Sequence, residues 1–366
     1  MKYKRYLLSE LVIIKYGKNQ KKVLSADGTI PIYGTGGLMG YATEALYSQP
    51  SVLIGRKGTI GKVKYVDHPF WTVDTLFYTV VNSDIVIPKY LYYVMSQIDL
   101  NTYNEGTTIP SLRTETLNRL EFDIPSIEEQ KEILSYLEPI DEKIELNNAI
   151  NNNLEQQAQA LYKSWFVDFE LNSGVMPSDW KVSQLGSVAK ISTEVFSPAK
   201  NPNVEVEHYS IPAYDEKHYP MFETSNGIKS NKYRLTSNSV MISKLNPDTK
   251  RIWRPYCISD NPICSTEFIV YEPINPLNRD FIYSIIDSIG FSAFLCSHTT
   301  GSTNSRQRAT PSITLTYDIV VPDEKTIQTF CSIVSPMYDI IENNIKEIQK
   351  LAETRDKLLP KLIVVV

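Results

Sequence analysis

Two stretches of the chain carry hydrophobic or small residues at alternating spacings of four and three. In the first stretch these residues are Ile133, Leu137, Ile140, Ile144, Asn147, Asn151, Leu154, Ala158 and Leu161. In the second they are Phe330, Val334, Met337, Ile341, Asn344, Ile348, Leu351, Arg355 and Leu358. A spacing of this kind, sustained over about four heptads, predicts a long helix that packs on another helix as a coiled coil.

Local signals mark where these helices begin and what interrupts them. Ser126 with Glu129 three residues later predicts a capping box, and Asp323 after Pro322 predicts the second start. Pro139 and Pro336 fall within what we expect to be the first turns, where each should kink its helix.

One seam position is polar in both predicted helices, because Asn147 and Asn344 occupy the same place in the pattern. A buried asparagine there would fix the register of the coiled coil at some cost in stability. An asparagine exposed by a kink or by drift of the seam would neither fix the register nor lower the stability.

A globular block precedes each long helix. Short runs rich in Tyr, Val, Ile and Thr, separated by Gly and Pro, predict strands at residues 51–54, 62–66 and 76–81 and again at 239–243 and 268–271. Short helices are predicted at residues 89–97 and 280–294. Each half of the chain therefore consists of a mixed block followed by a long helix.

The two halves repeat one plan. Ser51-Val52-Leu53-Ile54 corresponds to Ser239-Val240-Met241-Ile242, Tyr90-Leu91-Tyr92 to Phe281-Ile282-Tyr283, and Leu161 to Leu358. The offset grows along the chain, so the second block carries insertions. We predict an α+β fold with two globular mixed α/β domains, separated by two long helices that form an antiparallel coiled coil with an internal pseudo-two-fold axis. The expected boundaries are residues 1–125, 126–170, 171–321 and 322–366.

Charge is distributed unevenly. The chain carries 37 Lys and Arg against 42 Asp and Glu, a net charge of −5. Residues 126–170 hold 3 basic against 10 acidic residues, whereas residues 1–125 hold 14 against 11 and residues 171–321 hold 14 of each. The acidity therefore lies in the first long helix, and the two blocks are neutral to basic.

Basic loops recur at equivalent places in the two blocks. Residues 56–62 (RKGTIGK) and residues 244–251 (KLNPDTKR) each follow the strand that the halves share. Arg, Lys and Asn bind phosphates and read base edges in the major groove. The candidate DNA-binding residues are Arg56, Lys57, Thr59, Lys62, Arg113, Lys229, Lys232, Arg234, Lys244, Asn246, Lys250, Arg251, Arg254, Arg306 and Arg308; the alternative is that these are ordinary solvated loops.

Residues 31–41 (PIYGTGGLMGY) hold four of the 15 glycines. A cofactor loop needs G-x-G-x-x-G spacing and a helix opening after it, and both are missing here. We expect the glycines to allow tight backbone turns, either for packing within the domain or for close approach to DNA, and the sequence does not choose between these two uses.

Catalytic and metal-binding motifs are missing from the sequence. There is no G-x-S-x-G, no G-x-x-x-x-G-K-[ST] and no Asn-Pro-Pro-aromatic motif for amino methylation of a base. The four cysteines and four histidines show no metal-ligand spacing. We expect no catalytic residues, no metal and no cofactor on this chain, and a reduced cytoplasmic protein without a membrane span.

Three segments resemble the specificity subunit of Type I restriction–modification systems (HsdS). Residues 124–133 (IPSIEEQKEI) are similar to the start of the family's first conserved helix, residues 160–169 (ALYKSWFVDF) to its end, and residues 53–62 (LIGRKGTIGK) to a strand and glycine turn of a target recognition domain. The sequence departs from the pattern at Ser126, where the family has a second proline, and at residues 321–325 (VPDEK), which lack the Glu-Gln pair.

The resemblance implies that each block recognises one half of a split site in double-stranded DNA. It implies that the coiled coil sets the spacer between the halves and docks two modification (HsdM) subunits, which a restriction (HsdR) subunit joins. S-adenosylmethionine, ATP and Mg would then be bound by those partners. Two alternatives stay open: a stand-alone or fused DNA adenine methyltransferase or restriction enzyme, and a coiled-coil adaptor that does not bind DNA.

Overall fold

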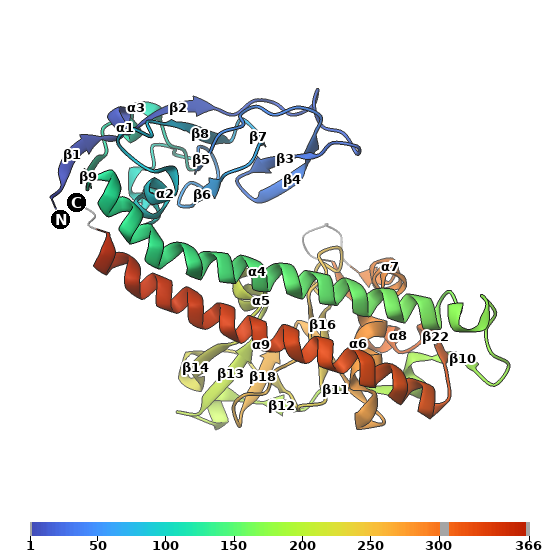
Figure 1. Cartoon of the computed structure of the whole chain (residues 1–366). Coiled ribbons are helices and arrows are strands. Elements are labelled where there is room, and N and C mark those ends of the chain that lie inside the picture. The colour runs from blue at the N-terminus through green and yellow to red at the C-terminus, as the bar shows by residue number, and fades with distance from the viewer. Residues whose placement is uncertain (1, 301–306, 364–366) are drawn as a thin grey trace. The chain divides into compact units, whose positions relative to one another are not determined.

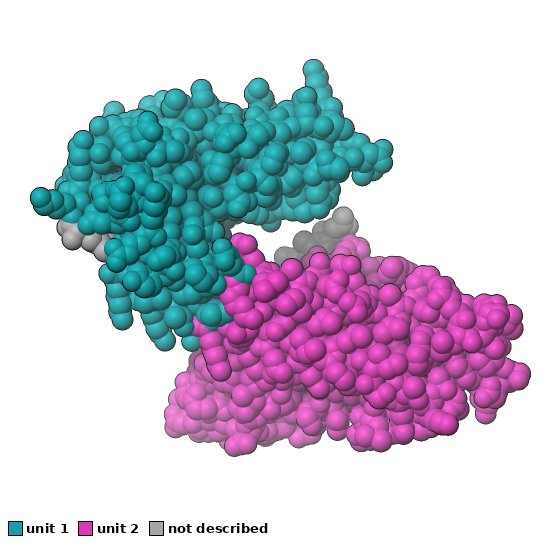
Figure 2. Space-filling view, viewed as in Figure 1, with its two compact units in different colours: residues 1–142, 351–366 teal, residues 143–350 magenta. Residues whose placement is uncertain are grey.

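A computed structural model describes residues 2–300 and 307–363 (Figure 1). Its contacts divide the chain into two compact units, which Figure 2 distinguishes by colour: unit 1 holds residues 1–142 and 351–366, and unit 2 holds residues 143–350. Both units therefore contain a globular block together with a part of each long helix.

Unit 1 has two larger sheets beside the two-stranded pair of β1 and β9. Strands β2, β8, β5 and β6 form an antiparallel sheet in that order, and β4, β3 and β7 form a second sheet in which β3 and β7 run parallel. The elements are β1 (Lys4–Leu7), α1 (Leu8–Leu11), β2 (Val12–Tyr16), β3 (Ile30–Gly34), β4 (Gly37–Ala42), β5 (Ser51–Gly55), β6 (Val63–Val66), β7 (Trp71–Thr72), β8 (Leu76–Val81), α2 (Pro88–Ser96), η1 (Leu100–Tyr103), α3 (Thr114–Asn118) and β9 (Glu121–Ile124).

Unit 2 repeats this arrangement with additions. Strands β11, β19, β16 and β17 form one sheet, and β12, β15, β18, β13 and β14 form the other. The elements are η2 (Glu170–Asn172), β10 (Lys181–Gln184), η3 (Leu185–Ser187), β11 (Ala189–Ser192), β12 (Val195–Phe196), η4 (Pro198–Lys200), β13 (Glu205–Tyr209), α5 (Ile211–Lys217), β14 (Met221–Thr224), η5 (Ser225–Gly227), β15 (Lys232–Arg234), β16 (Val240–Ser243), β17 (Ile252–Trp253), β18 (Pro262–Ser265), β19 (Phe268–Pro273), η6 (Pro276–Asn278), α6 (Arg279–Asp287), α7 (Ile289–Ser297), β20 (Thr299–Thr300), β21 (Arg308–Ala309), α8 (Pro311–Thr314) and β22 (Asp318–Val321).

The strand orders confirm the predicted internal repeat. Sheet β2-β8-β5-β6 corresponds to β11-β19-β16-β17, the β1–β9 pair to β10–β22, and the parallel pair β3–β7 to β13–β18. The insertions that the growing offset predicted include α5, which lies between β13 and β14, whereas β3 leads into β4 through a short turn.

The core of each unit follows the shared sheet. Every residue of β5 and of β16 is buried. Helix α2 adds Tyr90, Leu91 and Val94 to the unit 1 core, and α6 adds Phe281, Ile282 and Ile285 to the unit 2 core, each fully excluded from solvent. The predicted single helix at 280–294 is wrong, because Ser288 adopts extended backbone and its hydroxyl caps a separate helix α7 by accepting from Phe291 N at 3.1 Å.

Two long helices, α4 (Ile127–Phe166) and α9 (Glu324–Leu362), form the coiled coil. In unit 1, Arg355 Nη1 donates to Asp141 Oδ1 at 2.9 Å. In unit 2, Asn344 Nδ2 donates to Asn151 Oδ1 at 2.8 Å. In the same unit Asn147 contacts Glu347, so residue numbers rise along α4 as they fall along α9, and the two helices run antiparallel there. Every residue of the predicted seam is buried or half-buried.

The helix starts and interruptions differ in part from expectation. The Ser126 hydroxyl accepts from Glu129 N, and the Glu129 carboxylate accepts from Ser126 N at 3.1 Å, which is the predicted capping box. Pro139 and Pro336 lie deep inside α4 and α9, not in their first turns, and the helices are continuous through both. Asn147 is fully buried and donates to Glu347 Oε2 at 2.7 Å.

Membrane-spanning potential was tested on the described residues. No single helix among them is long and apolar enough to cross a membrane, and one bent pair, residues 276–287 with 289–297, reaches the required length and composition together. The large apolar side chains Phe281, Ile285, Phe291 and Leu295 of that pair lie in the core of unit 2.

Candidate nucleic-acid interface

In unit 1 the loop of residues 56–62 connects β5 to β6 as a hairpin. Its backbone is held by a second segment, because Gly58 N donates to Pro110 O at 2.9 Å and Leu112 N donates to Arg56 O at 3.0 Å. A side chain at Gly55 would meet the carbonyl oxygen of Thr59 at 2.1 Å, so the turn closes too tightly for any other residue.

The side chains of this loop differ in how far they reach solvent. Lys57, Thr59 and Lys62 are exposed, and Lys57 and Lys62 form no ion pair with the described residues. Arg56 is half-buried, donates to Asp74 O at 2.7 Å and lies 5.1 Å from the Tyr16 ring centroid. Arg113, on the bracing segment, is exposed and pairs with Glu105 at 3.2 Å.

Unit 2 repeats this hairpin. Residues 244–251 connect β16 to β17, and residues 307–309 brace the loop, since Asn246 N donates to Gln307 O and Ala309 N donates to Lys244 O, both at 2.9 Å. The predicted equivalence of the two basic loops therefore holds in three dimensions. Arg306 lies outside the described residues.

Most predicted cations of unit 2 are paired with carboxylates. Lys250 contacts Asp287, Arg251 donates two hydrogen bonds to Asp215 at 2.6 and 2.8 Å, Arg308 donates two to Glu267 at 3.0 and 3.2 Å, and Arg234 lies 3.6 Å from Glu194. Lys229 and Lys244 form no ion pair within the described part of the chain. The predicted DNA-binding segments of unit 2 therefore present less unpaired positive charge than the sequence suggests.

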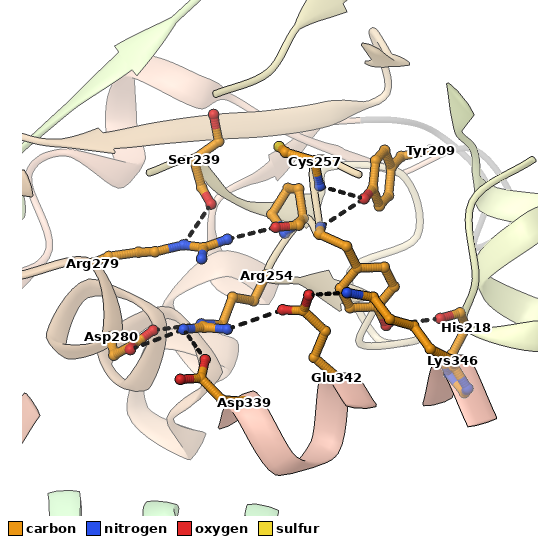
Figure 3. Close-up of polar contacts among 12 residues, drawn as sticks. Tyr209, His218, Ser239, Arg254, Cys257, Arg279, Asp280, Asp339, Glu342 and Lys346 are labelled. Carbon is orange, nitrogen blue, oxygen red and sulfur yellow. Dashed lines mark hydrogen bonds and ion pairs between the residues drawn. The ribbon is translucent and has the colours of Figure 1, made fainter. Parts of the chain in front are cut away.

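Arg254 and Lys232 were predicted to contact DNA, but the structure places both inside unit 2. The Arg254 side chain is 13% exposed and pairs with Asp280 at 2.7 Å, Asp339 at 2.9 Å and Glu342 at 3.3 Å (Figure 3). It thereby ties the domain to α9, and its carboxylate partners raise its pKa. Lys232 is buried and donates to Ser230 Oγ at 2.7 Å. Neither side chain is presented to a ligand.

Sequence reasoning missed Arg279, which lies beside Arg254 (Figure 3). Its guanidinium donates to Pro255 O at 2.7 Å and to Ser239 O at 3.3 Å. Burial, with the charge of Arg254, lowers the pKa of Arg279 to about 10. Arg279 stands at the start of α6, a helix equivalent to α2. Nothing in the sequence at that position predicted that its side chain would hold the backbone at Pro255 and Ser239.

The glycine-rich segment of residues 31–41 is a β-hairpin formed by β3 and β4. Its turn lines a notch of about 340 Å³ together with the start of β6. The notch is lined by Tyr33, Gly34, Thr35, Gly36, Gly37, Leu53, Thr59, Lys62, Val63, Lys64 and Leu76. Two features that the sequence kept apart, the glycine turn and the basic loop, therefore meet at one place.

A second cavity, of about 470 Å³, lies inside unit 2 between the coiled coil and the globular block. It is lined on one side by α4 and α9 and on the other by aromatic residues such as Tyr214, Trp253 and Tyr256. Burial raises the pKa of Asp287 on its wall. Within the described residues no group of three or more His, Cys, Asp or Glu side chains could hold a metal ion.

Comparison with known proteins gives one consistent family. A family model for the Type I restriction modification DNA specificity domain matches residues 2–156. The chain is 26% identical to the Type I restriction enzyme MjaIX specificity subunit of Methanocaldococcus jannaschii, over 87% of this chain and 78% of the relative. It is 37% identical to the HindI specificity subunit of Haemophilus influenzae over 30% of this chain and 26% of that protein.

Among solved structures, the crystal structure of the Type I restriction–modification system S subunit from M. genitalium has the same fold. It superposes with a TM-score of 0.63 at 17% identity, covering 100% of this chain and 97% of that one. The likeness therefore extends over both units and both long helices.

Proposed function

Because the chain belongs to the specificity-subunit family of Type I restriction–modification systems, we propose that it reads a bipartite DNA site, one half with the globular block of each unit. The observation that carries this proposal is the repeated hairpin: β5–β6 and β16–β17 each present a basic loop that a second segment braces. Two copies of one binding scaffold on one chain suit a site with two separate halves.

The coiled coil is the part that we assign to the spacer between the half-sites. Helix α4 is continuous over 40 residues and α9 over 39, and an α-helix of that length spans about 60 Å. Their antiparallel contacts lock the two helices together, with the buried Asn147 and Asn151 fixing the register. A rigid element of fixed length would impose a fixed number of unspecified base pairs.

The catalytic steps are assigned to other subunits. As a member of this family the chain is the non-catalytic specificity subunit, which assembles with other subunits and with DNA. We propose that two HsdM subunits dock on the long helices and bind S-adenosylmethionine, and that HsdR, with ATP and Mg, joins them. The acidic surface of α4 supports protein partners over DNA at the coiled coil, because it would repel phosphates.

The most direct test is to sequence the methylated bases in cells that express this chain with its modification subunits. We expect one methylated motif in two parts, separated by a fixed number of unspecified base pairs. A continuous motif would contradict the division of labour between the units. Stoichiometric binding of S-adenosylmethionine by the isolated chain would instead favour an autonomous methyltransferase.

A further inference from the structure

The notch in unit 1 brings together a glycine turn and two lysines. The turn at residues 34–37 forms one wall, and the start of β6 forms the other with Lys62 and Lys64. The floor is apolar, since Leu53 is 1% exposed and Leu76 is 6% exposed. Among the residues that the structure describes, no carboxylate lines the notch. Its rim is therefore positively charged and without a counter-charge of its own.

The two lysines are held differently. Both side chains are exposed, Lys62 at the end of the basic loop and Lys64 on β6. The Lys64 ammonium lies 4.0 Å from the centroid of the Tyr33 ring, whose hydroxyl is 3.2 Å from His68 Nε2. Partial burial lowers the pKa of Lys64, and neither lysine forms an ion pair with any described residue. An anion in the notch would supply the partner that both ammonium groups lack.

The glycines of the turn have separate reasons to be glycine. A side chain at Gly34 would meet Met39 Sδ at 2.3 Å, and Gly37 has a φ of +112°. Gly36 has neither constraint. No atom of the described residues lies within 4 Å of the position that its Cβ would occupy, and its φ is outside the left-handed region. The structure of the unit therefore does not require glycine at position 36. What glycine does provide there is room for a ligand to approach the backbone.

Unit 2 shows that the scaffold does not need this notch. Strand registers make Lys64 equivalent to Trp253, because Lys64 pairs with Leu53 as Trp253 pairs with Met241. Tyr33 and Tyr209 are equivalent by the same reasoning. Tyr33 pairs with Thr72, four residues before the start of β8, and Tyr209 pairs with Cys264, four residues before the start of β19. The Trp253 ring packs against Tyr209 with centroids 4.8 Å apart. An apolar ring thus fills the place that a cation holds in unit 1.

We propose that this notch binds a phosphodiester of the DNA backbone, through Lys62, Lys64 and the backbone of Gly36. The inference rests on the proposed function and adds the contact point. Lysine ammonium groups bind phosphate as point charges, and close approach to backbone N–H groups at a glycine turn adds donors. Such a contact positions the domain on the duplex and carries no sequence information.

The test compares charge variants of the full chain assembled with its modification subunits. Binding is measured against salt concentration on a duplex of mixed sequence and on one that carries the methylated motif. Lys62→Gln with Lys64→Gln should lower the slope of log K against log salt by about two, equally on both duplexes. Lys4→Gln is the matched control, because Lys4 also lies over a tyrosine ring, 4.7 Å from the centroid of Tyr6, outside the notch.

A size series at Gly36 tests the same site without a change of charge. Gly36→Leu should fill the notch and weaken binding to both duplexes, Gly36→Ala should weaken it less, and the urea midpoint should stay that of the wild type in both variants. An unchanged salt slope in the double lysine variant would overturn the proposal, as would a loss confined to the motif duplex, which means base reading. If the wild-type complex binds neither duplex, the proposed function itself fails.

Discussion

The two units place different chemistry on the same strands. Where unit 1 has Lys62 and Lys64 beside an open turn, the equivalent positions of unit 2 are Arg251, paired with Asp215, and Trp253, packed in the core. The difference comes from the insertion of α5, which supplies Asp215 and Tyr214 where unit 1 has only the β3–β4 turn. The repeat thus preserves a scaffold and leaves the contacts of each half-site to be built separately.

The polar contacts between each globular block and the coiled coil also use different residues in the two units. In unit 1, Tyr93 of α2 donates to Asp141 of α4 at 2.6 Å. In unit 2, Ser284 of α6 lies 3.1 Å from the hydroxyl of Tyr338 on α9. The tyrosine comes from the block in one unit and from the coiled coil in the other. A polar joint at this place is common to both units, while the residues that make it are not.

The largest effect is expected from Arg254, a cation that carboxylates enclose within unit 2. Arg254→Met should lower the free energy of unfolding by about 3–5 kcal/mol, because it leaves Asp280, whose side chain is 6% exposed, without its partner. Arg251→Met breaks a pair whose aspartate is 45% exposed and should cost about 1 kcal/mol or less. Urea unfolding of the full chain, followed by tryptophan fluorescence, measures both. Equal losses would show that Arg254 does not hold the domain to α9.

An intermediate effect is expected from releasing a paired cation. Asp215→Ala frees Arg251, at the position equivalent to Lys62, and should raise the salt slope of DNA binding by up to about one. Asp260→Ala removes the same charge from an exposed site of unit 2 and serves as the control. If both variants change the slope equally, the effect reports net charge alone and Arg251 does not face the DNA.

The smallest effect concerns pH. Burial lowers the pKa of His208 below its ordinary value of 6.5, although its partner Glu223, 2.7 Å away, opposes this shift. The unfolded chain then binds the proton more readily, so this contribution to stability is present above pH 6.5 and is lost as the pH falls below it. His208→Gln should flatten the acid side of the unfolding profile, whereas His298→Gln, at an exposed position, should leave it unchanged.

Regular spacing was the part of the sequence that predicted structure well. The four-three pattern located α4 and α9, and the repeated Ser-Val-x-Ile strand located β5 and β16. The function of individual cations was not predictable in this way. Arg251 and Arg254 stand three residues apart in one basic segment, and their side chains are equally little exposed. Arg251 nevertheless pairs with an exposed aspartate of α5, whereas Arg254 pairs with carboxylates from α6 and α9.

The notch was missed for a similar reason. Lys64 lies in strand β6 and Tyr33 in strand β3, and only the pairing of both sheets brings them together. The sequence left two uses open for the glycines of residues 31–41, and the structure separates them position by position. Gly34 is required for packing and Gly37 for its backbone angle. Gly36, which the domain itself does not require, is the position that we assign to close approach of DNA.

The measurement that tests the account most directly is methylated-base sequencing after lengthening the coiled coil. One heptad is inserted into α4 after Glu142 and one into α9 after Lys350, where the units meet in the chain. Seven helical residues add about 10 Å, or about three base pairs of DNA. We predict the same two half-sites with a spacer longer by about three base pairs. An unchanged spacer, or altered half-sites, would contradict the assignment of spacing to the helices and of reading to the two blocks.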